Sequence, residues 1–202
     1  MSHIPVNIAT EDELSAVTLE TLLAYVDRGY SIGTVYRRGG YGYLKKTIRG
    51  WNQAARSTPF IVLTDLDTSL CPINLLKDWL TDPLHPNLVF RVAVREVDAW
   101  LLADIESLCH YLRVGKMLIP EDTDTLTDPK KAVVDLAKRS RSSELKSRMV
   151  PKLGSTAKQG PDYNGCLSSF VRTTWKVGVA KRNSTSLRRT LERFAAFKPV
   201  WP

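Results

Sequence analysis

Carboxylates follow three separate stretches of β-forming residues in the first half of this 202-residue chain. Glu11 follows the first stretch, Asp65 and Asp67 close the second, and Glu96 follows the third. Residues two apart in an extended segment point to the same side, so Asp65 and Asp67 could share one ligand. Carboxylate oxygens suit Mg²⁺ or Mn²⁺, and without a cation such acids would repel one another. The pattern predicts a divalent-cation site that polarises a phosphate and activates water.

The elements that must position these acids alternate between strand and helix patterns. The run Pro59–Leu63 is continuously apolar, which is typical of a strand buried on both faces of a parallel sheet. Alternation of this kind predicts an α/β fold, with a largely parallel sheet flanked by helices. Ligands of such sheets bind beyond the carboxyl ends of the strands, where all four acids are expected. Strands are expected at 6–10, 30–36, 59–63 and 87–95, and helices at 10–26, 43–55, 73–80, 97–112, from 129, and at 184–197.

A helix-capping role is the alternative for each acid, because each also precedes a helix pattern. For the first helix, Thr10 with Glu13 three residues later predicts a capping box. A single acid is better explained as a cap. Four acids at three strand ends favour the metal site.

The charge of the chain lies in its second half. Residues 1–100 carry 10 Lys and Arg against 11 Asp and Glu, whereas residues 101–202 carry 19 against 10, and the whole chain has a net charge of +8. A nearly neutral first half followed by a basic second half indicates a surface that attracts polyanions. The alternative is a lysine-rich surface that is simply solvated. The residues expected to contact a phosphate backbone are Arg37, Arg38, Lys130, Lys131, Lys138, Arg139, Arg141 and Lys152.

Several classes of protein are not expected. No apolar run approaches the roughly 18 residues that span a bilayer, and the first residues do not resemble a signal peptide. Cys71, Cys109 and Cys166 form no CxxC pair, so neither a disulfide framework nor a zinc cage is predicted, and a cytoplasmic location is expected. The glycine-rich loop at 37–42 lacks the GxxxxGK[ST] spacing, so no nucleotide hydrolysis by this chain is expected.

Four segments carry a resemblance to a known family: IATEDELS, FIVLTDLD, RVAVREVDAWLLAD and GSTAKQGPDYN. Glutamate after the first strand, followed by a strand ending in Asp-x-Asp, resembles the TOPRIM domain of topoisomerases, primases and OLD-family nucleases. The four segments together resemble more closely a TOPRIM-like family, formerly of unknown function, that includes the nuclease subunit of the PARIS anti-phage system. The resemblance implies a TOPRIM-like (Rossmann-like) core at 1–112, and a basic helical and loop part at 113–202 that completes the same domain.

The resemblance also implies roles for the acids. Glu11 would be the TOPRIM glutamate, acting as metal ligand or general base, and Asp65 and Asp67 would be the metal-binding pair. Glu96, with Asp98 as second candidate, would add a further ligand or hold the first ones in place. The family's glutamate is usually followed by glycine, whereas Asp12 follows here, so Glu13 is the alternative.

Hydrolysis also needs a cation for the developing charge. Lys158, in the GSTAKQGPDYN segment, is the candidate, and Arg95 is the second choice. No tyrosine nucleophile is evident, so a covalent intermediate is not expected.

The resemblance implies a Mg²⁺- or Mn²⁺-dependent endonuclease that cleaves RNA, with transfer RNA suggested, or DNA. It would be a toxic effector of anti-phage defence, controlled by an ABC-type ATPase partner, and could form a homodimer on activation. One alternative is a non-catalytic subunit that binds nucleic acid or an ATPase through the basic half. Another is a haloacid-dehalogenase-like phosphatase with Asp65 as nucleophile and Asp67 as acid, although that motif usually lies on the first strand.

Overall fold

The computed structural model describes residues 3–37, 39–69, 71–115 and 121–201 of the chain. Contacts between residues divide the chain into two compact units. The first unit is Met1–Val94 with Arg189–Pro202, and the second is Arg95–Arg188. The boundary between the units therefore lies after Val94, and the last residues of the chain belong to the first unit. The sequence suggested a boundary after residue 112.

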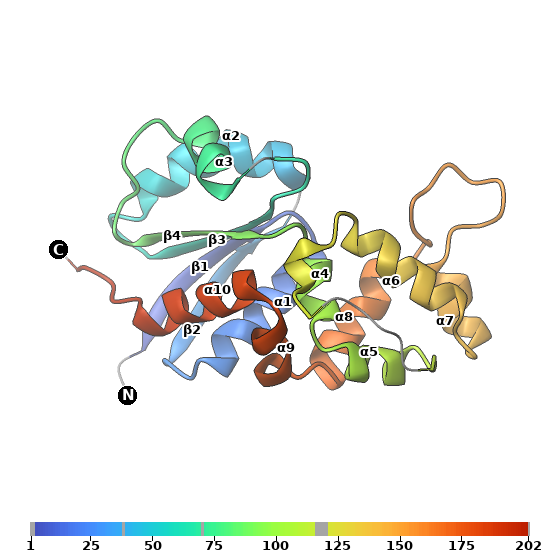
Figure 1. The fold of residues 1–202 in the computed structure, drawn as a ribbon. Helices are drawn as coiled ribbons and strands as arrows, with labels where there is room; N and C mark the ends of the chain where they lie inside the picture. Colours follow the sequence, from blue (N-terminus) through green and yellow to red (C-terminus); the bar gives the residue numbers. More distant parts are fainter. Residues whose placement is uncertain (1–2, 38, 70, 116–120, 202) are drawn as a thin grey trace. The chain divides into compact units, whose positions relative to one another are not determined.

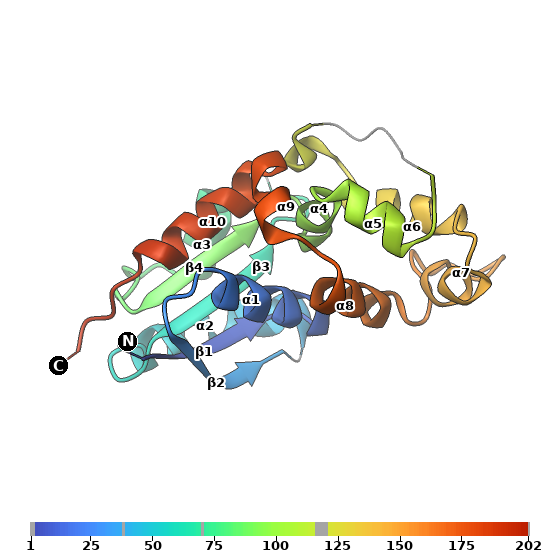
Figure 2. The same ribbon diagram turned by 90° about the horizontal axis from the view of Figure 1, so that it is seen from below.

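The first unit is built on a four-stranded parallel sheet with the strand order β2-β1-β3-β4. Helices α2 and α3 cover one face of this sheet, and α1 and the end of α10 cover the other (Figures 1 and 2). The expected α/β fold with a parallel sheet flanked by helices is thus confirmed. The elements are β1 (Ile4–Thr10), α1 (Glu13–Tyr25), β2 (Tyr30–Tyr36), α2 (Gly40–Ala54), β3 (Phe60–Asp65), α3 (Pro72–Trp79), β4 (Leu88–Ala93) and α10 (Thr185–Ala196).

Strand β3 lies at the centre of the apolar core. Its residues from Phe60 to Leu63 are at most 3% exposed, as their continuous apolar pattern predicts. On the α2 side an aromatic cluster packs against them, with the ring of Trp51 centred 6.4 Å from that of Phe60 and 5.7 Å from that of Tyr36. A strand buried on both faces cannot shift its register without exposing its core residues, so the position of its carboxyl end is fixed.

Hydrogen bonds at the β2 edge of the sheet hold the end of α10 and the residue that follows it. The hydroxyl of Tyr30, on β2, donates to the carbonyl oxygen of Phe194 at 2.7 Å, and Arg28 donates to that of Phe197 at 3.1 Å. The last carbonyls of a helix have no partner within the helix, and an arginine there also meets the negative end of the helix dipole. These contacts hold the carboxyl end of α10 against the first unit.

The second unit is helical in the residues that the structure describes. Its elements are α4 (Val97–Leu102), α5 (Ile105–Tyr111), the 3₁₀ turn Thr123–Thr125, α6 (Pro129–Lys138), α7 (Ser143–Met149), α8 (Tyr163–Thr173) and α9 (Val177–Asn183). The prediction of one helix over 97–112 is wrong, because Asp104 interrupts it. Its carboxylate caps α5 by accepting from Ser107 N–H at 3.4 Å, and also accepts from Lys176 N–H at 2.8 Å.

No helix among the described residues is long and apolar enough to cross a bilayer.

Asn87 anchors the carboxyl-terminal segment to the first unit. The side chain is fully buried, donates to the carbonyl oxygens of Ala55 (3.1 Å) and Val200 (2.8 Å), and accepts from Val200 N–H at 2.7 Å. Replacing it by alanine leaves the buried Ala55 carbonyl and the part-buried backbone groups of Val200 without these partners. We expect Asn87→Ala to lower the free energy of unfolding by about 2–4 kcal/mol in urea titrations followed by tryptophan fluorescence. Gln53→Ala, at an exposed position of α2, should change it by less than about 0.5 kcal/mol. Equal effects of the two substitutions would contradict this account.

Candidate metal site at the carboxyl edge of the sheet

Glu11 is held by the strand next to its own. Strands β1 and β3 pair in parallel with Thr10 beside Leu63, so the residue after β1 lies level with Thr64. One carboxylate oxygen of Glu11 accepts from the Thr64 hydroxyl at 2.5 Å and from the Asp65 N–H at 3.0 Å. The carboxylate is therefore oriented by groups of β3 before any ligand arrives. Thr64 is a residue that sequence reasoning missed, although its place beside the acidic pair was a signal.

The surroundings of Glu11 oppose its negative charge. Partial burial raises the pKa of this carboxyl above its ordinary value, and the hydrogen bonds from Thr64 and from the Asp65 backbone offset part of the increase. The negative charges of Asp67 and Asp12 raise the pKa further. A carboxylate in such a place is stabilised either by a proton or by a nearby cation.

Asp67 lies in a tight turn directly after β3. The turn is closed by the N–H of Ser69, which donates to the carbonyl of Leu66 at 2.9 Å, while Leu66 itself is buried and donates its N–H to Ala93 on β4. Asp67 has a φ of +48°, in the left-handed region that few residues other than glycine, asparagine and aspartate adopt readily. This backbone places Asp67 at the surface, with Asp65 half-buried two residues before it.

The acidic residues after Glu11 have other contacts, and these contacts distinguish the two candidates for the site glutamate, Glu11 and Glu13. Helix α1 begins at Glu13, and its cap is Asp12, whose carboxylate accepts from Ser15 N–H at 2.8 Å. The predicted capping box on Thr10 is therefore wrong, because Asp12 occupies the cap position one residue before the helix. Glu13 forms an ion pair with Arg37. Of the two candidate glutamates, Glu11 is the one that the structure brings to Asp65 and Asp67.

The chemistry of these three carboxylates fits a hard divalent cation. Among the residues described, however, no three His, Cys, Asp or Glu side chains come close enough together to hold an ion by themselves. Mg²⁺ usually keeps several waters and takes only one or two protein carboxylates, with substrate phosphates completing its shell. The binding of Mg²⁺ or Mn²⁺ by Glu11, Asp65 and Asp67 therefore stays a prediction.

Glu96 and Asp98 belong to the second unit and join its helices. Glu96 accepts from Lys130 N–H at 3.2 Å, at the start of α6, and its other oxygen lies 3.9 Å from the Lys130 ammonium. Asp98 is buried and accepts from the hydroxyl of Tyr163. Burial, followed by the charge of Asp98, raises the pKa of Tyr163 well above its ordinary value. These contacts give both acids a structural role within this unit, and their role as metal ligands stays a prediction.

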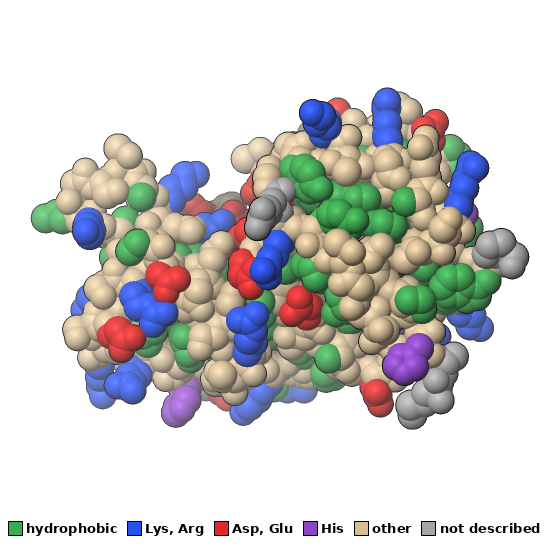
Figure 3. Space-filling view, turned by 180° about the vertical axis from the view of Figure 1, so that it is seen from behind, with side chains coloured by type: hydrophobic (Ala, Val, Ile, Leu, Met, Phe, Trp, Pro, Cys, Tyr) green, Lys and Arg blue, Asp and Glu red, His purple; other side chains and the backbone are tan. Residues whose placement is uncertain are grey.

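Several of the predicted phosphate-binding residues form ion pairs. Lys131 and Lys138 both contact Asp135, at 2.6 and 2.7 Å, and Lys130 lies beside Glu96. Figure 3 shows one face of the molecule, on which both basic and acidic side chains are present. The two pairs with Asp135 are exposed, so they contribute little to stability, are screened by salt and remain open to exchange for other anions. The structure also describes Arg139, Arg141 and Lys152, which are exposed, whereas Arg38 lies outside the described residues.

Lys158 lies in an exposed loop of the second unit whose base is closed. Gly160 N–H donates to Met149 O at 2.9 Å, and Arg148 donates two hydrogen bonds to Asp162, at 2.9 and 2.6 Å. A Cβ at Gly160 would lie 2.3 Å from Arg148 O, so only glycine allows this approach. The base of the loop is fixed and Lys158 is exposed, and its catalytic role stays a prediction.

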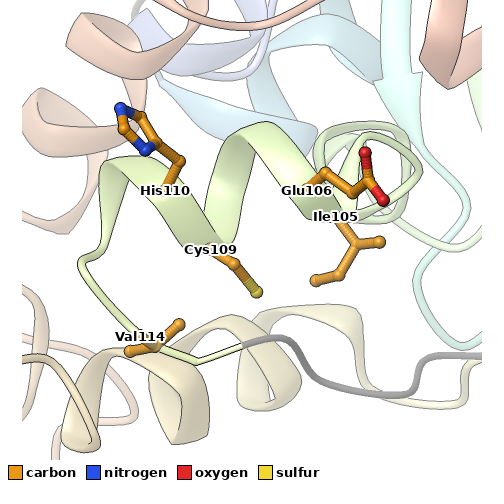
Figure 4. A pocket seen from close by; sticks show the side chains of 5 residues that line it. All are labelled: Ile105, Glu106, Cys109, His110 and Val114. Atoms are coloured by element: carbon orange, nitrogen blue, oxygen red, sulfur yellow. The ribbon is translucent and has the colours of Figure 1, made fainter.

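A hollow of about 280 Å³ beside α5 contains a cysteine and a histidine but no catalytic pair. Figure 4 shows that the sulfur of Cys109 and the imidazole of His110 point to different sides of α5. Nucleophilic cysteine chemistry needs a base within hydrogen-bonding reach of the sulfur. The hollow therefore gives no support to a cysteine-dependent activity.

Comparisons of this chain with protein-family models, curated proteins and solved structures find no match.

The raised pKa of Glu11 predicts how stability depends on pH. The folded protein favours the protonated carboxyl, so this favourable contribution is present at acid pH and is lost as the pH rises through the folded-state pKa. Glu11→Gln keeps an acceptor oxygen for Thr64 and Asp65 without the charge. We expect this variant to melt a few degrees higher than the wild type near pH 8, and the difference to shrink toward pH 4.

Melting curves across this pH range would measure the effect in metal-free buffer. Glu20→Gln, on α1 and partly exposed, is the control and should follow the wild type. A Glu11→Gln variant that is less stable than the wild type at alkaline pH would contradict the assigned surroundings of Glu11.

Proposed function

We propose that the first unit is a TOPRIM-type nuclease core that hydrolyses phosphodiester bonds with Mg²⁺ or Mn²⁺. The observation that carries this proposal is the carboxylate of Glu11, oriented by Thr64 and Asp65 at the edge where β1 and β3 end. Open parallel sheets bind their ligands at this edge. The order of the motifs, a glutamate after the first strand and Asp-x-Asp after β3, agrees with the proposal.

Each carboxylate has a role in this proposal. Asp65 and Asp67 would hold the cation, which when bound neutralises charge on the phosphate and makes water a better nucleophile. Glu11 would contact the same cation or take the proton from the attacking water. A carboxylate with a raised pKa is a stronger base than an ordinary one, which suits the second role. Thr64 would act as a positioning residue, because its hydroxyl fixes one oxygen of Glu11 and leaves the other available.

The biological setting of the proposal comes from the sequence resemblance alone. On that basis we infer a toxic effector of anti-phage defence that cleaves RNA, such as transfer RNA, or DNA, under the control of an ABC-type ATPase. The chain carries no Walker A motif of its own, so the ATPase would be a separate protein.

The phosphatase alternative has less support. Its nucleophile motif usually lies on the first strand of the domain, whereas β1 and β2 both precede Asp65 here. In addition, one oxygen of Glu11 accepts from the backbone of Asp65, an interaction that a nucleophilic aspartate does not need.

A cleavage assay tests the nuclease directly. Purified protein, alone and with its genomic-neighbour ATPase, would be mixed with total RNA or plasmid DNA in Mg²⁺, Mn²⁺ or EDTA. We expect cleavage that requires the metal, and a loss of at least about 100-fold in Glu11→Gln and Asp65→Asn, because each removes a charged group that acts on the reacting phosphate. Glu13→Gln and Glu20→Gln should keep the wild-type rate.

The outcomes separate the alternatives. Cleavage lost in Glu13→Gln and kept in Glu11→Gln would transfer the catalytic role to Glu13. Hydrolysis of phosphomonoesters with a covalent phosphate on Asp65 would establish the phosphatase. No cleavage under any condition with the ATPase present, while nucleic acid or the ATPase is still bound, would favour a non-catalytic subunit and overturn the proposal.

A further inference from the structure

Arg91 is a partly buried charge in the sheet of the first unit. It lies on β4, and its neighbour Phe90 packs its ring 5.5 Å from that of Trp79 on the α3 side. Successive side chains of a strand face opposite sides, so Arg91 lies on the side covered by α10. There its Nε donates to the hydroxyl of Thr190 at 3.1 Å.

Helix α10 brings two more arginines to the same place. Arg189 directly precedes Thr190, and Arg193 follows one turn later on the helix, so the two lie on neighbouring positions of its surface. Both are exposed, and the guanidinium carbon of Arg193 lies 5.9 Å from the centre of the Phe197 ring. Arg91 thus contacts the buried Thr190 hydroxyl, and Arg189 and Arg193 lie near enough for their charges to act on Arg91.

The three arginines have no acidic partner in the part of the chain that the structure describes, since none of the ion pairs found there includes them. Burial lowers the pKa of Arg91, and the positive charges of Arg193 and Arg189 lower it further. A charge removed from water is normally paired, so the burial of Arg91 carries a cost that an anion would relieve.

Donors remain available for such an anion. The Nε of Arg91 has its partner in Thr190, but no hydrogen bond to a described residue uses its two terminal nitrogens. Among the described residues, three buried side-chain polar atoms have no hydrogen-bond partner: Thr18 Oγ1, Ser168 Oγ and Trp175 Nε1. The terminal nitrogens of Arg91 are not among these buried atoms. Arg91 as a whole is partly exposed, so a ligand can approach it from the solvent.

We propose that Arg91, Arg189 and Arg193 bind a phosphate group of a nucleic-acid backbone. Guanidinium groups match the tetrahedral phosphate because they donate paired hydrogen bonds and keep their charge at any physiological pH. Contacts to phosphates carry no sequence information, so binding of the backbone at this cluster would not depend on base sequence. This inference rests on the proposed nuclease function and adds to it a second contact with the substrate strand.

The register of the sheet relates this cluster to the carboxylates. Arg91 pairs with Leu63, which in turn pairs with Thr10, so Arg91 is level with the residue that precedes Glu11. Two strand spacings, about 10 Å, separate β4 from β1. A bound strand could therefore place one phosphate at the carboxylates and a nearby one at the arginines.

Binding can be measured without cleavage. Fluorescence anisotropy in EDTA would follow short labelled single-stranded RNA and duplex DNA, titrated with protein over a range of salt concentrations. The test variant is Arg189→Gln with Arg193→Gln, both on the surface. The matched control is Arg49→Gln with Arg56→Gln, which removes the same charge from two other exposed positions. Arg49 lies in the carboxyl half of α2, and Arg56 lies just after this helix. Circular dichroism would check that both variants fold.

We expect the test variant to bind about tenfold more weakly at low salt, and its salt slope to fall by about 1–2, while the control changes little. Arg91→Lys keeps the charge but not the paired donors, and should weaken binding by a smaller factor. Equal binding by test and control variants would overturn the proposal. A second result would also overturn it. In that case inorganic phosphate raises the melting temperature of the wild type but not of the test variant, while nucleic acid binds both equally well.

This experiment and the cleavage assay can fail separately. If the arginines are needed for binding but the protein never cleaves, the phosphate site is supported and the nuclease function is overturned. If cleavage needs the metal and Glu11 but binding does not need the arginines, the nuclease function is supported and the phosphate site is overturned.

Discussion

The parallel pairing of β1 with β3 is the constraint on which the candidate site depends. It sets Thr10 beside Leu63 and so brings the next residue, Glu11, level with Thr64. A slip of one residue would turn every side chain of β3 to the opposite face and separate Glu11 from its two donors. The buried side chains from Phe60 to Leu63 prevent such a slip, because they fill the core on both faces. The apolar core thus determines the geometry of a polar site.

Much of the first unit could be predicted because its signals are local. A continuous apolar run marked the buried strand β3, and the alternation of strand and helix patterns marked the elements around it. The convergence of Glu11 with Asp65 follows from one further rule, that parallel strands end at the same edge. Features that depend on distant residues could not be predicted. Asp104 interrupts the helix after α4 because it also accepts from Lys176, which is 72 positions away in the chain. Nor does any local pattern reveal that Arg91 meets Thr190.

Capping shows why a local pattern can mislead about a particular residue. Thr10 and Glu13 satisfy the spacing of a capping box, but Thr10 still belongs to β1, where its hydroxyl donates to the carbonyl of Asp12 at 3.0 Å. Asp12 then takes the cap position with its own carboxylate. The helix therefore needs nothing from Glu11. This division of roles explains how three acidic residues can stand in a row at the end of a strand, of which only the first turns toward β3.

Two charges of opposite sign are held at a cost in the same sheet. Glu11 is partly buried near the negative Asp67 and Asp12, and Arg91 is partly buried near the positive Arg189 and Arg193. Neither arrangement is explained by stability, because a neutral side chain of similar shape would avoid the cost of burying a charge. A cation relieves the first and an anion the second. A phosphodiester with its divalent counterion supplies both charges in one ligand, and the register of β1, β3 and β4 sets the two places within about two strand spacings of each other.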